Sequence, residues 1–248
     1  MAGASHSLLR RLGVCAGLTA IILMIAAPPT SGAQTIDASS FPTLKQAITG
    51  TCTAAASAVA APADDCGAIK TAVIGQANGT TLHFARYCLD DIVKHVGDFC
   101  ILQGMAVLAQ SSKSGQTTRL FETSSDTDET YQAPALVDSP YGKILDIAIT
   151  IAGTGHFNRS VYLLLKDGQW QKLDNSSWLN DLQSRIPNGT EVHKGIWPNL
   201  ITMQAHTDLY KPEDPDCCPT AGTVDIKLEL VGTRLTIKSL TVGPPPKS

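Results

Sequence analysis

Two cysteines, Cys217 and Cys218, stand next to each other in a short loop that also holds Asp214, Asp216 and two prolines. Cα atoms of neighbouring residues lie about 3.8 Å apart, whereas relaxed disulfides prefer roughly 4.4 to 6.8 Å. A bond between the two cysteines would therefore close a strained ring and be easier to reduce than other disulfides. The doublet constrains its loop and indicates an oxidising compartment, but it does not by itself indicate a chemistry.

The first 33 residues have the three parts of a secretory signal. Arg10 and Arg11 are followed by an apolar stretch over residues 12–27 and by small residues up to Ala33. This pattern predicts export to the periplasm or the outside, with cleavage near Ala33. The alternative is an uncleaved membrane anchor, but the apolar stretch is short for a span of about 20 residues. We therefore expect no membrane span in the mature form.

The remaining cysteines indicate a disulfide framework. Once the leader and its Cys15 are removed, the doublet is joined by four cysteines of the first half: Cys52, Cys66, Cys88 and Cys100. An even number is typical of exported disulfide proteins, although six cysteines allow 15 pairings. The simplest pairing joins each of the four to its neighbour along the chain, which leaves Cys217 for Cys218. The alternatives are that the doublet bonds to two N-terminal cysteines or stays reduced.

Charge and length exclude some partners. The chain has 248 residues and a formal net charge of −3, and its lysines and arginines form no cluster. Nucleic acids and anionic membranes both attract concentrated basic patches. We therefore expect no nucleic-acid partner, while the length suffices for one large or two small domains with a hydrophobic core.

Helices are predicted at the start of the mature chain. Pro42 suits the first turn of one helix, and Asp64 with Asp65 suits the cap of a second. Residues 82–96 are predicted to form a third helix. Four apolar residues recur there at helical spacing: Ala85, Leu89, Ile92 and Val96. A hairpin is expected to follow, with a strand from Phe99, a turn over residues 111–115 and a return strand.

Strands are predicted for most of the second half. Apolar and polar residues alternate over residues 145–151 and again over residues 224–237. Asp167 and Gly168 form a dipeptide that accepts the positive φ angles of a tight hairpin turn.

Two further elements complete the second half. Residues 176–186 predict a helix with Trp178 in its apolar face, and residues 200–210 predict a strand whose core side includes Ile201. The patterns together predict an α+β fold, with a helical N-terminal segment packed on a mainly antiparallel, disulfide-stabilised sheet. The expected regions are a leader, an N-terminal region, a C-terminal region and a Pro-rich tail: residues 1–33, 34–138, 139–243 and 244–248.

A polar row on the predicted strand 200–210 is the first candidate site. His206 and Asp208 lie two residues apart and would point to the same face, where His156 or His193 would join them as a proton-transfer or metal site. The alternative is an ordinary solvent-facing strand, which we favour. The chain has no complete motif for a catalytic, cofactor or metal site, so we expect no cofactor.

Trp197 is the second candidate, because loop residues carry binding roles more often than core residues do. Its aromatic face suits a small molecule, a glycan or a protein of the cell envelope. The C-terminal segment, with Asp216 before Cys217, Cys218 and Pro219, resembles uncharacterised exported bacterial proteins with an Asp-x-Cys-Cys-Pro loop and a hairpin. That resemblance implies a secreted domain and no known activity.

These observations favour an exported, non-catalytic binding or envelope-associated protein. One alternative is an exported hydrolase that uses His206 and Asp208, with or without a metal. Another is a redox- or metal-responsive module that uses Cys217 and Cys218.

Overall fold

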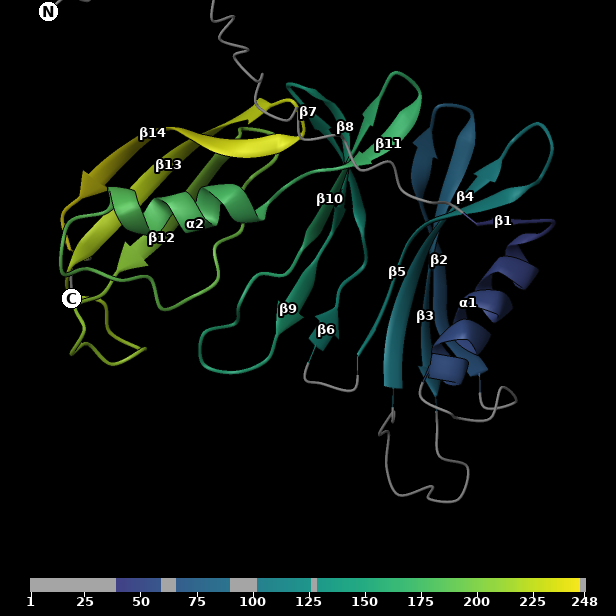
Figure 1. Cartoon of the computed structure of the whole chain (residues 1–248), viewed down its shortest axis with the longest axis horizontal. Coiled ribbons are helices and arrows are strands. Elements are labelled where there is room, and N and C mark those ends of the chain that lie inside the picture. The colour runs from purple at the N-terminus through teal and green to yellow at the C-terminus, as the bar shows by residue number, and fades with distance from the viewer. Residues whose placement is uncertain (1–38, 59–65, 90–101, 126–128, 246–248) are drawn as a thin grey trace, which may run out of the picture. The chain divides into compact units, whose positions relative to one another are not determined.

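The computed structural model describes residues 39–58, 66–89, 102–125 and 129–245 (Figure 1). Within these ranges the chain forms fourteen strands and two helices, and the named strands pair in antiparallel fashion. The fold is therefore mostly antiparallel β. The predicted α+β fold with a helical N-terminal segment is wrong, because the N-terminal region consists mainly of strands.

Five strands of the N-terminal region form one sheet in the order β1-β5-β4-β3-β2. Their bounds are Ser40–Phe41 for β1, Cys66–Ala77 for β2, Thr80–Leu89 for β3, Leu102–Ser111 for β4 and Thr117–Ser125 for β5. Helix α1 (Leu44–Ala58) lies beside this sheet (Figure 1), where its Ala47 packs against Ala106 and Leu108. The helix predicted after Pro42 is thus confirmed, as is the turn between β4 and β5.

The other two helices predicted in this region are wrong. Strand β2 replaces the helix after Asp64 and Asp65, and strand β3 occupies the start of the helix predicted over residues 82–96, of which 90–96 lie outside the described residues. In β3, Leu82 and Ala85 are both buried although they point to opposite faces. A strand buried on both faces loses its polar alternation, so its apolar spacing resembled that of a helix.

The middle of the chain forms a four-stranded sheet in the order β11-β10-β8-β7. Its strands are β7 (Ala135–Ser139), β8 (Gly142–Ile147), β10 (Val161–Lys166) and β11 (Gln169–Lys172), and the short strands β6 (Glu129–Tyr131) and β9 (Ile149–Ile151) pair beside it. The turn at Asp167 and Gly168 has φ angles of 51° and 77°, which confirms the predicted hairpin. One core cluster joins this sheet to the N-terminal sheet through residues such as Phe84, Leu145 and Leu163.

The last strands form a three-stranded sheet of β12 (Gln204–Leu209), β13 (Gly222–Val231) and β14 (Arg234–Gly243), which confirms the predicted C-terminal hairpin. Helix α2 (Ser176–Arg185) packs against it, and the fully buried Trp178 lies in their shared core. The carboxylate of Asp174 caps the helix by accepting hydrogen bonds from the backbone N–H groups of Ser176 and Ser177.

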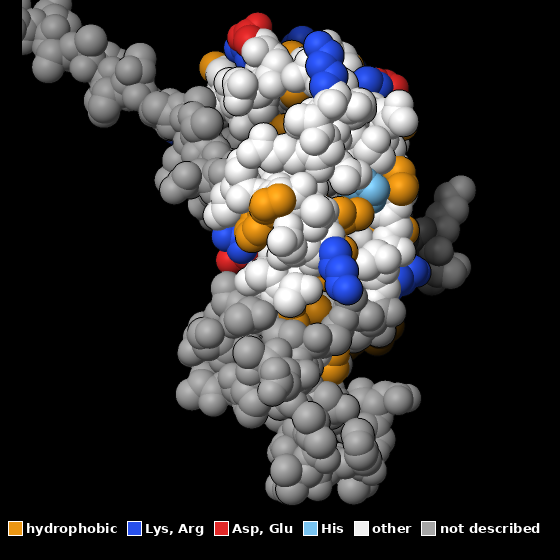
Figure 2. Space-filling model, turned by 90° about the vertical axis from the view of Figure 1, so that its right-hand side faces the viewer, with side chains coloured by type: hydrophobic (Ala, Val, Ile, Leu, Met, Phe, Trp, Pro, Cys, Tyr) orange, Lys and Arg blue, Asp and Glu red, His pale blue; other side chains and the backbone are white. Residues whose placement is uncertain are grey.

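One predicted core position in this region is wrong. Ile201 is 62% exposed, because residues 200–203 form a turn and β12 begins only at Gln204. Neither helix among the described residues is long and apolar enough to cross a membrane. On the face shown in Figure 2, basic side chains are scattered among uncharged ones rather than gathered in a patch.

Candidate functional site

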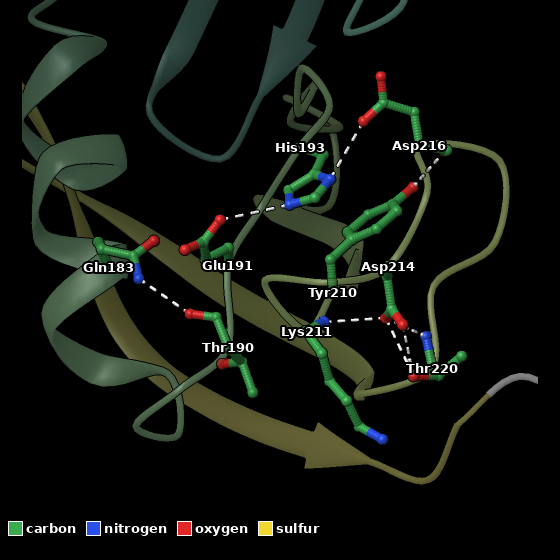
Figure 3. Close-up of polar contacts among 9 residues, drawn as sticks. All are labelled: Gln183, Thr190, Glu191, His193, Tyr210, Lys211, Asp214, Asp216 and Thr220. Atoms are coloured by element: carbon green, nitrogen blue, oxygen red, sulfur yellow. Dashed lines mark hydrogen bonds and ion pairs between the residues drawn. The ribbon is translucent and has the colours of Figure 1, made fainter.

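The loop over residues 211–220, which we call the cysteine loop, is closed by one carboxylate. Asp214 accepts hydrogen bonds from the backbone N–H of Lys211 at 2.9 Å and from the N–H and hydroxyl of Thr220, both at 2.8 Å (Figure 3). The hydrogen bond from Lys211, together with those from Thr220, lowers the pKa of Asp214. An ionised carboxylate thus holds the two ends of the loop together.

Cys217 and Cys218 are joined to each other by a disulfide, which confirms the vicinal pairing. Their Cα atoms lie 3.8 Å apart, both residues are exposed, and the N–H of Cys218 donates to the carbonyl of Pro215. Cys52 and Cys88 are each disulfide-bonded as well. Cys100 lies outside the described residues, and the pairing among the four N-terminal cysteines stays a prediction.

His193 connects the cysteine loop to the body of the protein. Its ring stacks on Tyr210 with 4.2 Å between the centroids, and its Nδ1 lies 3.1 Å from an Asp216 oxygen (Figure 3). Its Nε2 lies 3.4 Å from a carboxylate oxygen of Glu191. The Tyr210 hydroxyl in turn donates to the backbone carbonyl of Asp216. Since both ring nitrogens face carboxylates, His193 is held in one orientation rather than left open toward a ligand.

Two loops, residues 153–158 and 193–197, lie against each other, and we call them the paired loops. The N–H of Gly195 donates to the carbonyl of Gly155 at 2.9 Å, and the Asn158 amide donates to the carbonyl of Ile196 at 2.6 Å. A Cβ atom at Gly195 would lie 2.3 Å from the carbonyl oxygen of His156, so only glycine permits this approach. The two backbones therefore support each other as one unit.

Two large aromatic side chains project from the paired loops. Phe157 is 54% exposed and Trp197 is 43% exposed, and each ring lies against the glycine two residues before it in the chain. Asp216 of the cysteine loop also reaches the paired loops, because the Thr154 side chain hydrogen-bonds to it and, with His193, lowers its pKa. The predicted candidates Trp197, Cys217 and Cys218 thus belong to neighbouring loops that share contacts.

A pocket of about 240 Å³ opens beside Phe157. Apolar side chains form much of its lining: Leu179, Leu182, Val192 and Ile196. Lys194 is the one charged residue among those that line it. The pocket thus combines an apolar floor with a single positive charge, which suits an apolar group next to an anionic one.

The predicted polar row lies on the more exposed side of β12, in line with the ordinary strand that we favour. His206 points its Nδ1 at Asp225 of the neighbouring strand, 2.7 Å away, whereas Asp208 is opposite Thr223 in the register. His206 and Asp225 are both more than half exposed, as on an ordinary solvent-facing strand. Within the described ranges, no group of three or more His, Cys, Asp or Glu side chains could hold a metal ion.

Sequence reasoning missed the carboxylate of Asp146. It lies in β8, burial raises its pKa to about 6, and its Oδ1 is buried without a hydrogen-bond partner in the described structure. The preceding residues Ile144 and Leu145 are buried in two different core clusters. Both faces of this strand are thus covered. The alternation of apolar and polar residues in the sequence did not indicate that the polar face is covered.

Comparison of the chain with protein-family models, with curated protein sequences and with solved structures finds no match. The resemblance to exported proteins with an Asp-x-Cys-Cys-Pro loop therefore stays a prediction. A function has to be inferred from the loops and pockets themselves.

Proposed function

We propose that the mature protein is an exported, non-catalytic binding module and that the paired loops form its binding surface. The observation that carries this proposal is the exposure of Phe157 and Trp197 on two loops that are braced by backbone contacts. Aromatic side chains supply most of the binding energy in many interfaces. Loops that are already ordered lose little conformational entropy when a partner binds. The predicted leader and the disulfide at Cys217 support a location outside the cytoplasm.

The partner that best suits this surface is a protein of the cell envelope. The neighbouring pocket has room for one apolar side chain, and Lys194 at the pocket would pair with a carboxylate next to it. A polypeptide segment supplies both groups at short spacing, and the two exposed rings would cover the flanking residues. The binding surface proposed here does not require His206 or Asp208.

We expect the double variant Phe157→Ala/Trp197→Ala to lose at least about tenfold in affinity for its partner, because two exposed anchors are removed from one surface. Wild-type and variant proteins would be immobilised and exposed to envelope extract, and the retained proteins would be quantified by mass spectrometry. Val231→Ala is the matched control, because Val231 is also exposed and apolar but lies at the end of β13. Equal retention of the same proteins by the double variant and the control would contradict the proposal.

A second candidate function, a redox-responsive module, is supported by the exposed Cys217–Cys218 disulfide. A dithiol would donate two electrons to this bond, each sulfur would take up a proton, and the dithiol would become a disulfide. Cys217 lies next to Asp216, which contacts His193. Opening of the disulfide would therefore alter the contacts between the cysteine loop and the paired loops.

We expect dithiothreitol to reduce the Cys217–Cys218 bond faster than the disulfide that contains Cys52. Both members of the doublet are exposed, whereas Cys52 is 2% exposed, and access of the attacking thiolate controls the rate of exchange. Alkylation of newly formed thiols, followed by proteolysis and mass spectrometry, would give the order of reduction. Reduction of Cys52 before the doublet would exclude the redox candidate.

A further inference from the structure

Three hairpin turns meet at one end of the N-terminal and middle sheets. The Asn78 side chain of the β2–β3 turn donates to the carbonyl of Gly168 in the β10–β11 turn at 3.0 Å. The N–H of Ser112 in the β4–β5 turn donates to the carbonyl of Gly79 at 3.0 Å. The other two turns are thus each hydrogen-bonded to the β2–β3 turn, and the three together form one corner of the molecule.

A pocket of about 210 Å³ lies in this corner. Its apolar surface comes from Ala109, Leu120 and Trp170, which are all nearly buried. Hydroxyl and amide side chains contribute the polar part, among them Thr118, Gln116 and Gln169. None of the residues that line the pocket carries a charge.

Two polar side chains at this pocket have donors and acceptors that no described residue uses. The side chains of Gln116 and Gln169 are exposed, and neither side chain makes a hydrogen bond to another described residue, because Gln116 bonds its neighbours through its backbone. A primary amide offers two donors and an acceptor, so each can serve a ligand hydroxyl as donor and acceptor at once. The pocket therefore offers a small apolar wall and, at its rim, two neutral side chains that can each bond a ligand.

We propose that this pocket binds a neutral saccharide unit. A pyranose has an apolar face of C–H groups, which suits the small apolar wall of the pocket, and an edge of hydroxyls, which suits amides and hydroxyls. A charged ligand would find no opposite charge among the lining residues, and a purely apolar ligand would leave the amides without partners. The site is separate from the paired loops, so it does not depend on the binding function proposed for them.

The test is a titration of the full mature protein with glucose, galactose, mannose, N-acetylglucosamine, maltose and chitobiose, followed by ligand-observed NMR. Glucuronic acid serves as the charged counterpart. We expect at least one neutral sugar to bind, and the double variant Gln116→Ala/Gln169→Ala to weaken its affinity about tenfold, because two hydrogen bonds are lost. Gln204→Ala is the matched control, since Gln204 is an exposed glutamine on β12.

The possible outcomes of this titration distinguish the saccharide site from the paired loops. Loss of binding in the double glutamine variant, with unchanged binding in Gln204→Ala and in Phe157→Ala/Trp197→Ala, supports the saccharide site even if the paired loops have no partner. No binding of any neutral sugar at millimolar concentration would overturn it. Binding that is indifferent to Gln116 and Gln169, or that is restricted to glucuronic acid, would overturn it as well.

Discussion

Asp146→Asn is expected to stabilise the protein at neutral pH by roughly 2 kcal/mol, because asparagine removes a charge that the folded protein buries. Burial raises the pKa of Asp146 from 3.8 to about 6. Between these values the folded state keeps a proton that the unfolded state releases, so the free energy of unfolding of the wild type falls as the pH rises through this window. The loss is complete above the folded pKa and absent below the unfolded one.

Urea unfolding of both proteins at several pH values would test this expectation. The difference in unfolding free energy between Asp146→Asn and the wild type should be near zero at about pH 4 and largest at about pH 7. Asp138→Asn is a matched control, because Asp138 is an exposed carboxylate that pairs with Lys143 at the surface, where such pairs contribute little. A difference that does not change with pH would show that Asp146 is not buried in its charged form.

Gly104→Ala is expected to destabilise the protein by roughly 3 kcal/mol, at the upper end of the cost of overpacking a core. Gly104 is opposite Tyr87 in the β3–β4 pairing, and a Cβ atom there would lie 2.1 Å from the Tyr87 ring. Tyr87 is nearly buried, so the ring has little room to move. Gly75→Ala is the control, because its added Cβ would meet no atom closer than 3.4 Å.

Thermal or urea unfolding of Gly104→Ala in two backgrounds would identify the cause. If the clash with the ring is responsible, Gly104→Ala should cost much less in a Tyr87→Ala protein than in the wild type, since neighbouring substitutions are then not additive. Equal costs in both backgrounds would assign the effect to the backbone of β4 instead.

Local signals in the sequence were sufficient where one short segment decides the structure. The turn at Asp167 and Gly168, the helix around Trp178 and the bond between Cys217 and Cys218 all depend on residues close together in the chain. The turn follows from the backbone preference of its two residues, and the helix follows from its apolar stripe. The disulfide follows from the adjacency of the two cysteines. These elements were predicted correctly.

The helix predicted from residue 82 was wrong because the strand found there, β3, is covered on both sides. The signal for the hairpin was present, since Asn78 and Gly79 form the turn between β2 and β3 with φ angles of 47° and 69°. The apolar residues of β3 nevertheless suggested a helix, because burial of Leu82 and Ala85 on opposite faces removes the alternation that marks a strand. Weight given to the Asn-Gly turn would have corrected the interpretation.

The candidate site was only partly predictable. Trp197 stood out as a loop tryptophan, but its neighbour Phe157 comes from a segment about forty residues away, and only the fold brings Gly155 and Gly195 into contact. The stack of His193 on Tyr210 has the same origin. Contacts of this kind depend on tertiary packing, which no pattern in one stretch of sequence encodes.

Asp216 connects the paired loops to the disulfide, and this connection has a thermodynamic consequence. Its side chain contacts Thr154 of one paired loop and His193 of the other, and its backbone continues directly into the disulfide at Cys217. If reduction of that disulfide changes the affinity of the paired loops by some factor, occupancy of the loops must change the reduction equilibrium by the same factor. A partner bound to Trp197 would then act on the redox state of a bond that it never touches.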